Sequence, residues 1–321
     1  MPGARARSPY IEVMTSPLDN PSTPTRAPSD SARLICGLTP DVAAAPFRLA
    51  PEKADELNDT VFGGNPFELM FGDDLQEPAT NFTAFPGSRR IEVHFAALLS
   101  IWAVSHAALL VGAAAMSATR QGEATLDASP DADVLKAREL IAAARALIRD
   151  KEAPWPAGLP VPQAAAKPGA FDWYANNLFL AATGWVLLHE IAHIRLGHGG
   201  GAGRHDSLRQ EREADDWATR WVLEGAPADL TKEFRVLSIA VGLVWLAVLD
   251  GVRRGSTTHP HAWERLAAVS PQLETHELSP GLESATHVMK VLFLQDDEAE
   301  TFDTPNEAFF GTLISVSRLD R

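Results

Sequence analysis

Two histidines and a glutamate near the middle of the chain have the spacing of a metal-binding helix. The segment His189-Glu190-Ile191-Ala192-His193 places both imidazoles on one helical face, where they can reach a single divalent ion at about 2.1 Å. The preceding residues 178–188 are almost entirely apolar, which predicts a helix buried on every side. Buried imidazoles and carboxylates are costly without a partner. The pattern therefore predicts His189 and His193 as ligands of Zn²⁺, with Glu190 as general base toward water.

A second helix with acidic residues follows this motif. The histidine–glutamate pattern of residues 189–193 arises by chance in roughly one chain of this length in fifty, so it needs independent support. Gly197 and the glycines after it end the first helix. Ser207 and Gln210 form a capping box, which predicts that another helix starts there and carries residues 211–215. The glycine-rich turn lets the two helices fold back as neighbours.

The acidic residues of this second helix are the candidates for the third ligand. We predict that Glu211 binds the metal and that Asp215, one turn later, accepts a hydrogen bond from an imidazole N–H. Glu213 is the competing ligand, and a solvated charged face is the alternative for Glu211 and Asp215. His198 and His205 are further candidates, but the spacing of Gly197 and His198 does not fit a third histidine ligand. Both are expected to be loop histidines.

A third segment adds two possible donors. Residues 256–265 place His259 before Pro260 and Arg265 six residues after His259. Peptide hydrolysis develops an oxyanion that needs a hydrogen-bond donor, so His259 and Arg265 are candidate catalytic residues. The alternative is a capped helix start with a surface arginine.

Composition excludes some classes of function. The chain has 321 residues and a formal net charge of −14, which repels phosphate backbones and argues against nucleic-acid binding. Its single cysteine, Cys36, cannot form an intramolecular disulfide or a thiolate zinc cluster, and we expect it to be buried. A reducing compartment is therefore expected.

The chain is expected to form one domain behind a loose tail. Residues 1–33 lack an apolar signal-peptide region and predict a disordered tail, and residues 34–321 predict a single domain in a cytoplasmic protein. Phe95 to Met116 is uncharged and long enough to cross a bilayer. Its many alanines and its polar residues favour a core helix, with a membrane span as the alternative.

Local patterns predict a mainly α fold, of the α+β type, with a small N-terminal antiparallel sheet. The strands are predicted at 67–71 and 91–95, where apolar and polar residues alternate. A helix is predicted after Ser129-Pro130, a proline-rich loop over 153–169, and a capped helix from Thr304 to about Val316.

Several of these segments resemble the Lit family of phage-exclusion metallopeptidases. The likeness lies in HEIAH (189–193), EREAD (211–215) and THPHAWER (258–265), with further similarity in APFRLAPEK (45–53) and QEREADDWATRWVL (210–223). It covers roughly residues 40–320. The motif combination is shared more loosely with HtpX-like membrane peptidases and ImmA-like regulator-cleaving proteases.

The resemblance implies a zincin-like, gluzincin-type core in which Glu211 is the third zinc ligand. It also implies that His259 and Arg265 lie at the substrate site. Its implied substrate is translation elongation factor Tu, cleaved when a phage-derived activator peptide signals infection. The alternatives are a stress- or regulator-cleaving zinc protease, and a non-catalytic interaction module in which the metal only staples two helices.

Overall fold

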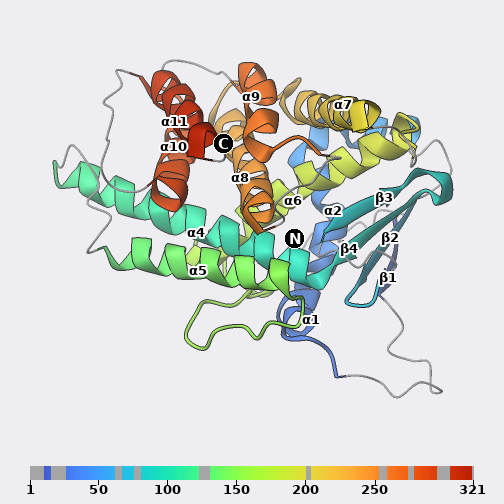
Figure 1. Ribbon diagram of the computed structural model, residues 1–321, viewed down its shortest axis with the longest axis horizontal. Coiled ribbons are helices and arrows are strands. Elements are labelled where there is room, and N and C mark those ends of the chain that lie inside the picture. Colours follow the sequence, from blue (N-terminus) through green and yellow to red (C-terminus); the bar gives the residue numbers. More distant parts are fainter. Residues whose placement is uncertain are drawn as a thin grey trace, which may run out of the picture.

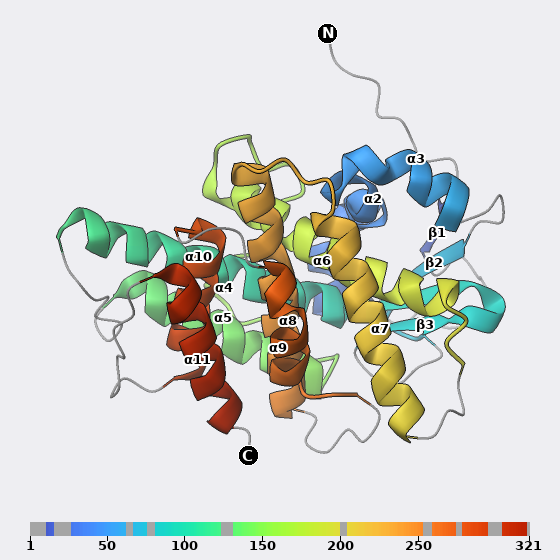
Figure 2. The same cartoon turned by 90° about the horizontal axis from the view of Figure 1, so that it is seen from above.

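The protein is mainly helical, with one small sheet at the end of the molecule opposite α10 and α11 (Figures 1 and 2). The computed structural model describes residues 11–15, 27–61, 67–75, 81–122, 131–199, 204–252, 259–273, 278–294 and 304–319. The helices are α1 (Asp30–Ile35), α2 (Thr39–Leu49), α3 (Ala54–Glu56), α4 (Phe95–Arg120), α5 (Ala132–Arg149), α6 (Phe171–Arg195), α7 (Arg204–Leu223), α8 (Leu230–Val252), α9 (Ala262–Leu273), α10 (Pro280–Phe293) and α11 (Pro305–Leu319). The strands are β1 (Ile11–Thr15), β2 (Phe67–Gly72), β3 (Phe82–Phe85) and β4 (Arg90–His94); short 3₁₀ turns are η1 (Cys36–Leu38), η2 (Pro51–Lys53) and η4 (Pro86–Ser88), and η3 (Leu57–Val61) is π-helical. These assignments confirm the predicted mainly α class.

The sheet is mixed, so the prediction of an antiparallel sheet is wrong. Its order is β1-β2-β4-β3; β1 and β4 both run parallel to β2, and only β3 and β4 are antiparallel. After β2 the chain passes to the far edge, forms β3, and turns through η4 and Arg89 (φ 50°) into β4. Strand β4 lies between β2 and β3 and runs in the same direction as β2. The strand predictions at 67–71 and 91–95 match β2 and β4 to within a residue.

Buried tryptophans join the long helices of the core. Trp102 Nε1 on α4 donates to Asn176 on α6 at 3.1 Å, and Trp245 Nε1 on α8 donates to Ser100 on α4 at 2.8 Å. Each indole buries a large ring and still satisfies its N–H, which fixes the rotation of the helices it joins. One connected set of buried apolar side chains includes residues from Ile35 to Val316.

Helix α6 is held between α2, α4, α7 and α8. A Cβ atom at Gly184 would lie 3.1 Å from the Ala45 backbone oxygen, so the glycine permits the close approach of α2 and α6. Trp185 Nε1 donates to Thr219 on α7 at 3.1 Å and joins α6 to α7 one turn before His189. The His189–His193 motif therefore sits on a helix that is enclosed by four others, as its apolar sequence predicts.

Helices α4 and α8 are long and apolar enough to cross a membrane by length and composition. Their most apolar windows are 83% and 72% buried within the protein, as in a core helix. For Phe95 to Met116, this confirms the prediction of a packed helix. Whether the protein meets a membrane stays a prediction.

Some sequence predictions for other elements need correction. Residues 11–15 and 30–33 were predicted to belong to a disordered tail, but they form β1 and the start of α1. Pairing with β2 and the Ser29 cap of α1 account for this, because both satisfy backbone groups that local sequence does not reveal. Cys36 is exposed rather than buried. The predicted division into a tail and one domain stays a prediction.

The observed helix ends test the start and stop signals in the sequence. Helix α7 begins at Arg204, so Ser207 lies inside it and the predicted capping box is wrong as a start signal. Helix α11 begins at Pro305 with Glu307 N donating to Thr304 Oγ1 at 3.2 Å, which confirms the predicted cap. Helix α5 has Asp131 as its N-cap; Ser129 and Pro130 lie outside the described residues. The chain between α5 and α6 forms no helix or strand, as its prolines predict.

Candidate active site

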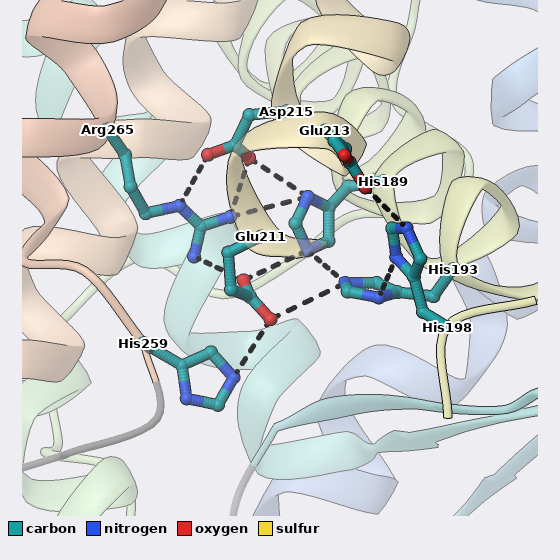
Figure 3. A network of polar contacts seen from close by, with 8 residues as sticks. All are labelled: His189, His193, His198, Glu211, Glu213, Asp215, His259 and Arg265. Carbon is teal, nitrogen blue, oxygen red and sulfur yellow. Dashed lines mark hydrogen bonds and ion pairs between the residues drawn. The ribbon is translucent and has the colours of Figure 1, made fainter. Parts of the chain in front are cut away.

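The two histidines of the motif lie on the last turns of α6 and face the same side. Their Nε2 atoms are 3.1 Å apart (Figure 3). Helix α6 then ends in a Schellman motif: Gly197 has φ +66°, its N–H donates to Ile194 O at 3.3 Å, and His198 N–H donates to His193 O at 3.0 Å. The glycine takes the left-handed conformation that stops the helix directly after the site.

Glu211 of α7 completes a group of three potential ligands. One ligand atom from each of His189, His193 and Glu211 lies within 4.8 Å of the others. Glu211 Oε2 is 3.4 Å from His189 Nε2, and Glu211 Oε1 is 3.5 Å from His193 Nε2. Donor atoms held about 2.1 Å from a tetrahedral ion lie about 3.4 Å apart, so these separations fit a zinc-sized ion. The buried Oε2 has no hydrogen-bond partner among the described residues, as expected for an oxygen that binds an ion.

Asp215 and Arg265 brace the His189 side of this group. Asp215 Oδ1 is 2.9 Å from His189 Nδ1, the ring nitrogen that faces away from the cluster. Arg265 of α9 donates to both oxygens of Asp215, Nη2 to Oδ1 at 2.7 Å and Nε to Oδ2 at 2.8 Å, and its Nη1 lies 3.4 Å from Glu211 Oε2. The Arg265 side chain is only 6% exposed. Its charge is therefore matched by two buried carboxylates, and the alternative of a surface arginine is excluded.

Glu190 and His259 face the same cavity. The cavity has a volume of ≈ 460 Å³ and is lined by residues of β3, α6, α7 and α8, together with His259 and Arg265. Glu190 is buried, and the Ala84 backbone N–H on β3 donates to its carboxylate. The His259 side chain is 47% exposed, and its Nε2 lies 3.3 Å from Glu211 Oε1. His259 is thus the more accessible donor of the two, whereas Arg265 is buried against Asp215 and Glu211.

Burial and mutual charge shift the pKa values of the site. Burial raises the pKa of Glu190 to about 7. Burial alone would lower the pKa of His189, but its contacts with Asp215 and Glu211 raise that pKa to about 10. Burial, together with the charge on His189, lowers the pKa of His193 to about 3. Burial opposes ionisation of Glu211, yet His189 and Arg265 hold its pKa below the usual range.

Sequence reasoning missed the role of His198 in this network. It is buried, its Nδ1 lies 2.9 Å from His193 Nδ1, and its Nε2 lies 3.2 Å from Glu213 Oε2. His198 follows the end of α6 outside any helix or strand, as predicted, but it is buried and not a free loop residue. The prediction of a loop is wrong for His205, which lies exposed on α7. Glu213 points to His198 and not to the ligand cluster. Gly197 was a usable signal, because a Schellman motif brings the residue after the glycine back to the helix's last turn.

Fold and site together define a mainly helical protein with a candidate divalent-metal site on two adjacent helices, beside a buried carboxylate. Residues 91–285 match the model of the Peptidase U49 family, and the chain therefore belongs to this family of peptidases. The matched range contains the candidate ligands together with Glu190, Asp215, His259 and Arg265, whereas Ala84 of β3 lies before it. The chain is also similar to the cell death peptidase of Escherichia coli (strain K12), with 29% identity over 243 residues, covering 72% of this chain and 79% of that protein. No solved structure matches.

These comparisons confirm the resemblance to the Lit family at the level of a peptidase family. The roles of the individual site residues stay predictions.

Proposed function

We propose that this peptidase is a zinc-dependent endopeptidase. The observation that carries the proposal is the convergence of His189, His193 and Glu211 within 4.8 Å, with Glu190 buried beside them in one cavity. Two imidazoles and one carboxylate leave a fourth position open, which is the donor set of catalytic rather than structural zinc sites.

Glu190 is the proposed general base. Bound zinc would supply Lewis-acid polarisation of the scissile carbonyl. Glu190 takes a proton from the attacking water and delivers it to the leaving amine, and its pKa of about 7 suits both transfers near neutral pH. The hydrogen bond from the Ala84 N–H on β3 holds the carboxylate in place between those two steps.

The two predicted donors have different proposed roles. His259 lies at the cavity mouth with a half-exposed side chain, so its imidazole is able to donate to the developing oxyanion. The Arg265 side chain is only 6% exposed and is held by Asp215 and Glu211. We therefore assign Arg265 to positioning the third ligand and assign the oxyanion contact to His259.

The cavity wall supports a polypeptide substrate. Strand β3 is the last strand in the sheet order of the described residues, and it lines the cavity directly above Glu190. An extended peptide can add to such an edge through backbone hydrogen bonds, which brings a peptide bond beside the general base.

The proposed biological substrate is elongation factor Tu. Similarity to the cell death peptidase and the sequence resemblance to the Lit family support a phage-exclusion role, in which a phage-derived peptide activates cleavage. A cytoplasmic location follows from that substrate. The alternative of a stress- or regulator-cleaving protease of the ImmA-like or HtpX-like kind uses the same site residues.

The test is Glu190→Gln, with exposed Glu264→Gln as the matched control. We expect Glu190→Gln to keep the zinc content of the wild type and to lose at least about 10²-fold of its cleavage of elongation factor Tu in the presence of the phage peptide. Zinc content and cleaved fragments are measured on the same preparations by elemental analysis and mass spectrometry. Unchanged cleavage in Glu190→Gln with zinc retained would refute the general-base role of Glu190, whereas zinc binding with no cleavage by the wild type would favour a metal-stapled interaction module.

The same comparison separates the possible substrates. Fragments that appear in a bacterial lysate with wild-type protein and are absent with Glu190→Gln identify the cleaved protein. A transcriptional regulator instead of elongation factor Tu would support the alternative protease.

A further inference from the structure

We propose that His198 and Glu213 form a positioning relay for the metal ligand His193, a role that rests on the proposed zinc site. The relay runs from His193 Nδ1 to His198 Nδ1 at 2.9 Å and from His198 Nε2 to Glu213 Oε2 at 3.2 Å (Figure 3). It lies on the Nδ1 side of His193, away from His189 and Glu211.

Helix termination explains why His198 reaches His193. In a Schellman motif the residue after the left-handed glycine donates its N–H to the carbonyl three residues before the C-cap, and the two side chains commonly touch. Here those residues are His198 and His193, joined by a backbone hydrogen bond of 3.0 Å. The usual apolar contact is replaced by two imidazoles whose ring centroids are 4.9 Å apart.

The order of the atoms assigns the protons. His193 turns Nε2 toward His189 and Glu211, so this nitrogen is the one free to bind an ion and Nδ1 carries the hydrogen. That N–H donates to His198 Nδ1, which must then be an acceptor. His198 in turn carries its hydrogen on Nε2 and donates it to the Glu213 carboxylate. His198 therefore fixes the tautomer and ring orientation of His193, and Glu213 fixes those of His198.

The far end of the relay is held at the surface. Arg209, one turn earlier on α7, donates to Glu213 Oε1 at 2.7 Å, so Glu213 uses one oxygen for Arg209 and the other for His198. The Glu213 side chain is 42% exposed, whereas that of His198 is only 6% exposed. A buried imidazole thus connects the ligand to an exposed ion pair.

The two imidazole ligands are consequently braced in different ways. His189 is braced by Asp215 and Arg265, which are both buried, and His193 is braced by a chain that ends in solvent-exposed groups. Loss of the His198 contact leaves the His193 ring free to rotate. It also allows the tautomer of His193 that carries its hydrogen on Nε2, the nitrogen that must bind the ion. Removing a hydrogen-bond partner that orients a metal ligand typically lowers metal affinity by about 10- to 100-fold.

The experiment uses the full-length protein, depleted of metal and titrated with zinc against a chromophoric chelator. His198→Leu keeps an apolar residue at a position where Schellman motifs favour one, so the helix end is preserved while both relay contacts are lost. We expect its zinc dissociation constant to rise about 10- to 100-fold. His205→Leu, at an exposed position of α7, is the matched control and should stay within about twofold of wild type.

Two further variants separate positioning from general structural damage. Glu213→Ala should weaken zinc binding less than His198→Leu does, and the double variant should equal His198→Leu, because Glu213 acts only through His198. His198→Asn should recover part of the loss, since its amide oxygen can accept from His193 Nδ1–H. The visible spectrum of bound Co²⁺ should change in His198→Leu while the Tm of the metal-free protein stays near that of His205→Leu.

The outcomes are distinct. A zinc dissociation constant for His198→Leu equal to that of His205→Leu, or additive losses for His198→Leu and Glu213→Ala, overturns the relay while the zinc peptidase proposal stands. Absence of zinc binding by the wild type overturns both. If His198→Leu does not fold, Glu213→Ala is compared with His205→Leu instead. An equal zinc dissociation constant and an unchanged Co²⁺ spectrum would then overturn the relay.

Discussion

Replacing Arg265 by methionine should destabilise the metal-free protein by about 3–5 kcal/mol, because it leaves buried carboxylates without their cation. The guanidinium makes contacts of 2.7 and 2.8 Å with Asp215 and of 3.4 Å with Glu211. Asp215 is 1% exposed and Glu211 is 7% exposed, so water cannot replace the lost partner. His189 remains beside both acids with a pKa of about 10 and offsets part of the loss, which favours the lower end of the range.

Urea unfolding of metal-free protein, followed by tryptophan fluorescence, measures this difference. Arg48→Met is the matched control: Arg48 pairs with Asp41 at 2.8 Å, but its side chain is 56% exposed. An exposed pair of the same length contributes less than about 1 kcal/mol, so burial is the variable that separates the two variants. Arg265→Lys should fall between them, since it keeps the charge and loses the two-pronged contact. Equal stabilities for Arg265→Met and Arg48→Met would refute the reasoning.

Three other predictions concern metal removal, backbone packing and pH. Chelation of the wild type should abolish proteolysis and lower its Tm, with both restored by added zinc; activity that survives complete metal removal would contradict the zinc mechanism. Gly281→Ala should destabilise the protein, because a Cβ atom there would meet the Glu233 backbone oxygen at 2.5 Å. Gly112→Ala, with open space inside α4, should stabilise it by about 0.5–1 kcal/mol. Equal shifts in Tm for the two variants would contradict this difference. Burial lowers the pKa of His106 from 6.5 to about 4. Between these pH values the imidazole is protonated in the unfolded chain and neutral in the folded protein. About 3 kcal/mol of stability is therefore lost as pH falls from about 6.5 to 4. His106→Phe should remove that part of the slope in unfolding experiments between these pH values, and an unchanged slope would exclude His106 as its source.

The sequence predicts the local parts of the site because they depend on short spacings. Two imidazoles four residues apart share a helical face in any α-helix, and an apolar run before them requires that the helix be enclosed. A glycine after the motif ends the helix, as Gly197 does. The same reasoning gives the cap of α11 at Thr304 and the loop rich in prolines between α5 and α6.

Some of the misassigned elements depended on long-range pairing. The strands at 67–72 and 90–94 were visible as alternating patterns, but their relative direction depends on where the chain passes between them. Strand β1 has no strong local signal and is held by parallel pairing to a strand about fifty residues later in the chain. Periodicity reports which face of a strand is buried and not which neighbour it meets.

What the sequence determined by itself is the pair His189 and His193 on a buried helix, with Glu190 beside them. Only the tertiary structure decided that Glu211 and not Glu213 faces that pair, because the rotation of α7 is set by its packing on α6 and α9. It also placed Arg265 beside Asp215 and set Glu213 against His198. Helical spacing places side chains relative to their own axis, whereas contacts between helices depend on the burial of whole apolar faces across the fold.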